Sequence, residues 1–125
     1  QIILMLGTND CKTVFSASAD VIGKGVVRLL EQAKRFSPDS KILLISPIFL
    51  GERVWEEGFD QEFSPESVEI SKRLGSVYEK IARKYGTDFL RASDYVESSE
   101  EDQEHMNANS HQIFASVVAE HLQSI

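Results

Sequence analysis

Two apolar runs, each about the length of one strand, constrain the fold of this chain more than any other feature. The first is Ile2–Leu6, and the second is Ile42–Ser46, which lies in "KILLISP" and ends before Pro47. A continuous apolar run of this length, without polar alternation, is typical of a strand that is covered on both faces. The sequence therefore predicts an α/β fold built around a buried parallel sheet.

Helical patterns separate and follow these strands. The apolar spacing predicts one helix from about Ala19 to Phe36. A second helix begins at Ser64-Pro65-Glu66, in the favoured order of cap, proline and acid, and ends at Gly86. A shorter strand, "TDFLRA", and a last helix around Ile113 complete the chain. Alternating strands and helices predict parallel pairing within a single domain, residues 1–125.

The predicted strand Ile2–Leu6 lacks a neighbour on one side. An apolar edge strand is prone to pair with other chains, so proteins rarely leave one uncovered. We therefore expect one or two further βα units before Gln1, roughly 60 residues at about 30 residues per unit.

Charge and composition restrict the partners. The formal net charge of -7 argues against binding to nucleic acid or to anionic lipid surfaces. No apolar run approaches the roughly 20 residues of a membrane span. The single cysteine, Cys11, excludes an intrachain disulfide and favours a reducing compartment, the cytoplasm by default. His105, His111 and His121 lack tight metal-ligand spacing, so neither a metal nor a cofactor is predicted.

Polar residues follow the first strand at the edge where ligands bind in parallel sheets, outside the carboxyl ends of the strands. Gly7 permits a sharp turn, and Asn9 presents a side-chain amide that could hold a developing oxyanion. Alternatively, Asn9 and Asp10 simply make a good turn. Cys11 could act as a thiol nucleophile, although a lone cysteine is more often a packed side chain.

The segment "EDQEHMNANSH", after the third strand, contains a second candidate group. Asp102 and His105 are three residues apart, so on one helical turn they would share a face. A carboxylate bound to one ring nitrogen fixes the imidazole tautomer and leaves the other nitrogen free to accept a proton. The alternative is an exposed acidic loop that happens to contain a histidine.

Taken together, these motifs resemble those of the SGNH (GDSL-like) hydrolase family. "LMLGTND" is similar to its third conserved block, a strand followed by Gly-x-Asn-Asp, and "DQEHMNANSHQIFASVVAEHL" to its fifth block, Asp-x-x-His before the final helix. "KILLISP" and "VYEKIARKYGTDFLRAS" fit the pattern between the two blocks. The resemblance covers nearly all of the chain and is nearest to the arylesterase-like and acyltransferase-like branch.

The resemblance implies a flavodoxin-like α/β/α sandwich whose first two strands are absent here. It also implies a serine esterase or acylhydrolase that acts on small-molecule esters, such as short-chain, aryl or acetyl-sugar esters. Asn9 would be an oxyanion donor on a turn shaped by Gly7, and Asp10 would support that turn. His105 would be the general base, oriented by Asp102.

The chain departs from the family pattern in two respects. The blocks that carry the nucleophilic serine and a second oxyanion donor are absent, and Ser46 matches a non-catalytic Ser-Pro. Gln103 and Glu104 stand where glycine and an apolar residue are commoner. Glu101 or Glu104 is therefore an alternative to Asp102 as the orienting acid.

Three questions stay open on the sequence alone. An acyltransferase would use the same residues, and a non-catalytic flavodoxin-like binding module would use none of them. Trp55 or Phe59, in the long segment Ile48–Phe63, could line a substrate pocket. Equally, they could cover the end of the sheet or form a contact in a homo-oligomer.

Overall fold

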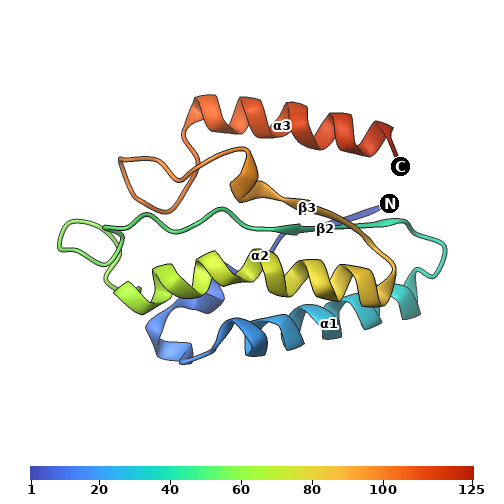
Figure 1. The fold of residues 1–125 in the computed structure, drawn as a ribbon, viewed down its shortest axis with the longest axis horizontal. Coiled ribbons are helices and arrows are strands. Elements are labelled where there is room, and N and C mark those ends of the chain that lie inside the picture. Colours follow the sequence, from blue (N-terminus) through green and yellow to red (C-terminus); the bar gives the residue numbers. More distant parts are fainter.

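The computed structural model describes residues 1–125 and alternates strands with helices along the chain (Figure 1). The main elements are β1 (Ile2–Leu4), α1 (Ala19–Phe36), β2 (Ile42–Ser46), α2 (Pro65–Tyr85), β3 (Asp88–Arg91) and α3 (Ala108–Gln123). Both strand pairs are parallel, and the order in the sheet is β1-β2-β3. The predicted alternation and the parallel sheet are therefore confirmed.

The helices cover the two faces of the sheet unequally. Figure 1 shows α1 and α2 on one side of the strands and α3 on the other, which makes three layers. The middle strand β2 is buried along its whole length, as its unbroken apolar sequence predicts. No helix combines the length and the apolar character that a membrane crossing requires.

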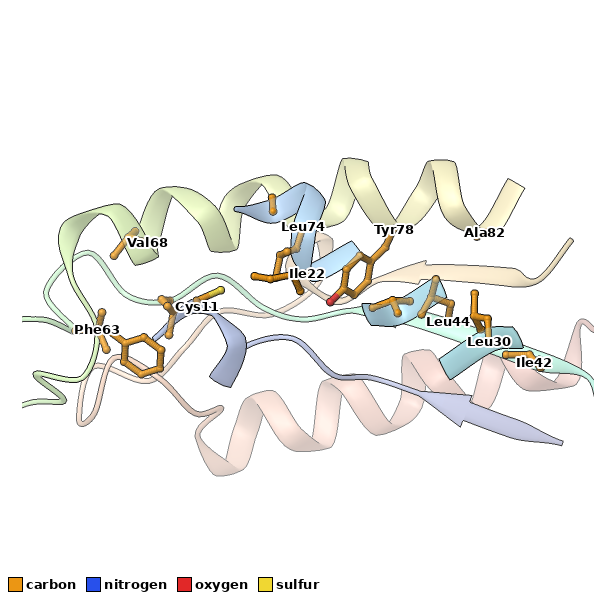
Figure 2. Close-up of a cluster of buried hydrophobic side chains, with 14 residues drawn as sticks. Cys11, Ile22, Leu30, Ile42, Leu44, Phe63, Val68, Leu74, Tyr78 and Ala82 are labelled. Atoms are coloured by element: carbon orange, nitrogen blue, oxygen red, sulfur yellow. The ribbon is translucent and has the colours of Figure 1, made fainter. Parts of the chain in front are cut away.

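The larger core lies between the sheet and the pair α1 and α2. Leu30 of α1, Leu44 of β2 and Tyr78 of α2 are each completely buried there. Figure 2 shows this cluster, with Leu74 and Tyr78 projecting from α2. Burying each such side chain contributes roughly 1.5–3 kcal/mol, so this layer fixes the position of the sheet relative to both helices.

The face under α3 is covered over the middle strand but less completely over β1. Leu43 of β2 is fully buried, whereas Ile3, its partner in β1, is 47% exposed. Leu6, just beyond β1, is 54% exposed, and no residue of α3 is fully buried. The β1 edge of the sheet is thus its most exposed apolar part.

Local signals in the sequence set the helix ends. Ser18 accepts a hydrogen bond from the Val21 N–H (3.2 Å) at the start of α1, and Ser64 and Ser67 form a reciprocal capping box on α2. β1 is shorter than the predicted Ile2–Leu6, because its pairing with β2 ends at Leu4 and the chain then leaves the ladder. β3 likewise occupies only Asp88–Arg91 of the predicted "TDFLRA".

Candidate functional site

Three rim loops follow the carboxyl ends of β1, β2 and β3: residues 5–18, 47–64 and 92–107. Hydrogen bonds join these loops into one surface. The Thr13 N–H donates to the Glu62 carbonyl (2.9 Å), which ties the first loop to the second. The Gly51 N–H donates to the Gln103 carbonyl (2.7 Å), which ties the second loop to the third. The candidate residues of the first and third loops therefore belong to one connected rim, the arrangement expected for a ligand site in a parallel sheet.

Gly7 occupies a position that no other residue fits. Its φ is 138°, a conformation that L side chains rarely adopt. A Cβ built at Gly7 would lie 2.2 Å from the hydroxyl oxygen of Tyr78. That hydroxyl donates a 2.7 Å hydrogen bond to the carbonyl of Leu6, so it cannot move aside without losing its partner. Tyr78 therefore fixes the path of the chain just before Asn9.

Asn9 opens a short 3-10 turn, Asn9–Cys11, in which the Asp10 N–H donates to the Gly7 carbonyl (3.1 Å). The Asn9 side chain is exposed and makes no hydrogen bond within the chain. It lines a cleft of about 470 Å³ between the end of β1 and the flank of α1. Its amide N–H groups are consequently available to a ligand.

Cys11 is buried in the core beneath this turn. Burial, and secondarily the charge of Asp10, raise the pKa of its thiol to about 12. Because a thiolate is the reactive form, this cysteine is inert at neutral pH. The structure therefore favours the packed side chain over the thiol nucleophile.

Asp102 and His105 meet in the loop before α3. His105 Nδ1 lies 2.7 Å from Asp102 Oδ2. The other carboxylate oxygen, Oδ1, accepts hydrogen bonds from the backbone N–H groups of Glu104 and His105 (2.9 Å each) and from the Ser99 hydroxyl (3.0 Å). The two side chains share a face as the spacing predicts, but in a turn, not a helix, because Gln103 has a φ of 64°.

These contacts set the charge states of the pair. Burial alone would raise the pKa of Asp102, but hydrogen bonds from the His105 and Glu104 backbone, the His105 ring and Ser99 together lower it well below its usual range. The hydrogen bond to Asp102 raises the pKa of His105, against a smaller effect of burial, and the negative charges of Glu104 and Asp60 add to the rise. An ionised carboxylate thus faces an unusually basic imidazole.

The remaining ring nitrogen, His105 Nε2, is free. The His105 side chain is 72% exposed, and Nε2 has no hydrogen-bond partner in the chain. Neither Glu101 nor Glu104 hydrogen-bonds to the ring, so Asp102 is the carboxylate in place to orient it. Burial and repulsion from Asp60 raise the pKa of the Glu104 carboxyl.

The other candidates make no hydrogen bond to this pair. Trp55 lines a shallow groove with the first turns of α2, and its indole N–H donates to the Glu52 carbonyl (2.9 Å). The Arg53 guanidinium lies 5.5 Å from the centre of the Phe59 ring. Ser46 is fully buried, and no group of three or more His, Cys, Asp or Glu side chains could hold a metal ion.

Three further residues shape the rim, and none of them belongs to the predicted site: Tyr78, Ser99 and Gln103. The apolar stripe of α2 includes Tyr78, but a buried tyrosine hydroxyl also needs a partner, and that requirement signals a role beyond packing. Ser99 stands three residues before Asp102, a spacing at which a serine hydroxyl bonds locally. No signal in the sequence marks the contacts of Gln103.

Several solved structures have the same fold as this chain. A crystal structure with 35% identity matches with a TM-score of 0.93, covering 98% of this chain and 57% of that chain. A carbohydrate acetylesterase from Sinorhizobium meliloti matches with 25% identity and a TM-score of 0.91, covering 99% of this chain and 60% of the other. A protein assigned as an arylesterase from Agrobacterium tumefaciens strain C58 matches with 27% identity and a TM-score of 0.82, covering 100% and 61%.

The chain has SGNH-type (GDSL-like) esterases among its structural neighbours, the family that its motifs resemble. Its fold is the three-layer α/β/α sandwich of SGNH esterases, as the sequence motifs predict. The chain spans about three fifths of the length of these three solved structures. No protein-family model and no curated protein sequence matches it.

Proposed function

We propose that the protein carrying this chain is a serine esterase or acylhydrolase for short-chain, aryl or acetyl-sugar esters. His105 serves as the general base, Asp102 orients it, and Asn9 donates to the oxyanion on the turn that Gly7 permits. The nucleophilic serine and a second oxyanion donor belong to a segment outside residues 1–125. The substrate classes follow the names of the structural neighbours, a carbohydrate acetylesterase and an arylesterase.

One observation carries this proposal. The 2.7 Å contact between His105 Nδ1 and Asp102 Oδ2 leaves Nε2 exposed at the carboxyl rim of an SGNH-type sheet. An imidazole held in this way can accept a proton from a hydroxyl nucleophile through Nε2, while the carboxylate stabilises the imidazolium. The carboxylate is itself held by three further hydrogen bonds, which keep it in place to orient the ring.

The reaction follows from these roles. The serine oxygen attacks the ester carbonyl carbon while its proton passes to His105 Nε2, and the carbonyl π electrons move onto oxygen. Asn9 and the second donor stabilise that oxyanion. When the tetrahedral intermediate collapses, the bond to the alcohol oxygen breaks and His105 returns the proton to it. Water then repeats the sequence on the acyl-enzyme and releases the acid.

Labelling with a fluorophosphonate tests the proposal. We expect one probe molecule on a single serine outside residues 1–125, located by peptide mapping of the longer protein. We also expect His105→Ala to lower the kcat for p-nitrophenyl acetate by more than about 10³-fold. His111→Ala is the matched control, because His111 is exposed on α3 and makes no contact with Asp102.

An unlabelled protein, with His105→Ala altering nothing but stability, would overturn the proposal in favour of a non-catalytic binding module. A label on a serine within residues 1–125 would overturn the assignment of the nucleophile. Where activity is present, product analysis with a competing alcohol separates hydrolysis from acyl transfer.

A further inference from the structure

Gln103 lies between the two members of the Asp102–His105 pair and has an unusual backbone. Its φ of 64° is left-handed, a conformation shared among the non-glycine residues only by Ser16. Such a conformation costs free energy in any residue that has a Cβ, so it persists only where surrounding contacts impose it. Gln103 is also only 6% exposed, which is rare for a glutamine in a surface loop.

The hydrogen bonds of the Gln103 side chain reach away from the pair, to the backbone of Arg53 and to the backbone and carboxylate of Glu100. Its Oε1 accepts the Arg53 N–H (3.3 Å), and its Nε2 donates to the Glu100 carbonyl (3.3 Å). Its carbonyl accepts the Gly51 N–H (2.7 Å). Gly51 permits this close approach, because a Cβ there would lie 2.2 Å from Gln103 Oε1.

Ser99 closes the same loop from the other side. Its carbonyl accepts the Gln103 N–H (2.8 Å), and its own N–H donates to the His105 carbonyl (2.7 Å). Its hydroxyl donates to Asp102 Oδ1 (3.0 Å). The segment from Ser99 to His105 is therefore a closed loop. Gln103 is the buried side chain of this loop that reaches the neighbouring rim loop, at Arg53.

We propose that Gln103 is a positioning residue, whose buried side chain clamps the Asp102–His105 loop onto Gly51 and Arg53 and so holds the pair in its hydrogen-bonded geometry. Its effect on rate rests on the proposed esterase function, but its effect on the pair does not. Displacing a reacting group by about 1 Å can cost up to 10²-fold in rate, so such a clamp affects catalysis without touching substrate.

The test compares two glycine substitutions in the longer protein that carries this chain. Gln103→Gly removes the side-chain hydrogen bonds to Arg53 and Glu100 but keeps the Gln103 carbonyl that accepts the Gly51 N–H. Glycine also relieves the left-handed backbone, so the fold is retained. Ser16→Gly is the matched control, because Ser16 has the other left-handed φ (47°) and an exposed side chain bonded only to the Thr13 carbonyl. The readouts are the pKa of the His105 imidazole by NMR, assigned with His105→Gln, and kcat and KM for p-nitrophenyl acetate.

With the clamp removed, the Asp102–His105 hydrogen bond loosens. We expect Gln103→Gly to lower the imidazole pKa toward its ordinary value and to lower kcat roughly 10- to 100-fold with little change in KM. Ser16→Gly should change neither. Unchanged imidazole pKa and kcat in a folded Gln103→Gly protein would overturn the proposal.

A second pair of variants keeps the test valid if Gln103→Gly proves unstable. Gly51→Ala forces a Cβ onto the Gln103 amide and should disturb the imidazole pKa from the opposite side. Gln103→Asn shortens the side chain and tolerates the left-handed conformation. In that background the added Cβ of Gly51→Ala meets a shorter side chain, so its effect on the imidazole pKa should be smaller. Strictly additive effects would overturn a direct clamp. Because the NMR readout needs no turnover, a wild-type protein without esterase activity would refute the proposed function while leaving the clamp testable.

Discussion

The first and third rim loops present their candidate residues by opposite means. The turn at Gly7–Asn9 is fixed by steric fit: the Tyr78 hydroxyl, 72 residues from Leu6 in sequence, occupies the space where a Cβ would go. The Asn9 side chain itself is unrestrained. The loop from Ser99 to His105 is fixed by hydrogen bonds that converge on the side chains themselves, above all on Asp102.

This contrast separates a neutral donor from a titrating base. An oxyanion donor needs only to be in position, since its amide carries no charge at any ordinary pH. A general base needs its basicity set as well as its position, so charged and polar groups must surround it. The first loop should therefore respond to changes in packing, and the third loop to changes in charge.

The largest effect expected in the first loop is that of Asn9→Ala on catalysis. Losing one oxyanion donor typically costs roughly 10²–10³-fold in kcat. Steady-state hydrolysis of p-nitrophenyl acetate measures this, with Asn109→Ala, an exposed asparagine on α3, as the control. An unchanged rate in Asn9→Ala would mean that the turn carries no catalytic donor.

Gly7→Ala should lower the stability of the fold. The added Cβ combines a left-handed backbone with a clash against the Tyr78 hydroxyl, which we expect to lower the free energy of unfolding by about 3 kcal/mol. Urea denaturation measures this. Adding Tyr78→Phe removes the clashing oxygen, so the cost of Gly7→Ala should be smaller in that background; equal costs in both backgrounds would contradict the steric account.

The smallest expected effect is in the third rim loop, where the charge of Glu104 acts on His105. Glu104 is among the charges that raise the pKa of His105, after the larger contribution of the hydrogen bond to Asp102. A general base must be neutral to accept a proton, so activity is lost as the pH falls below this raised pKa. Glu104→Gln lowers the pKa, and we expect the acid limb of the kcat/KM profile to move to lower pH.

The control for that shift is Glu101→Gln, since Glu101 is exposed and is not among the groups that alter the His105 pKa. The shift in Glu104→Gln should also shrink in 1 M salt, where the Debye length falls to about 3 Å. If the acid limb of the kcat/KM profile does not move in Glu104→Gln, the charge of Glu104 does not set the pKa of His105.

The sequence by itself determined those features that depend on near neighbours along the chain. The start of α2 followed from Ser64-Pro65-Glu66, because the Ser64 cap acts within three residues. The parallel sheet followed from unbroken apolar runs, because a strand covered on both faces needs no polar alternation. The contact between Asp102 and His105 followed from their spacing, although a turn and not a helix brings them together.

Only the tertiary structure decided which distant groups hold these local motifs in place. The Tyr78 hydroxyl fixes the chain before Gly7, and Gln103 locks against Gly51, across separations of 72 and 52 residues. Burial makes Cys11 inert, and neighbouring carboxylates make His105 more basic. Such effects depend on distances between atoms of different elements, which packing sets and which no local pattern of residues encodes.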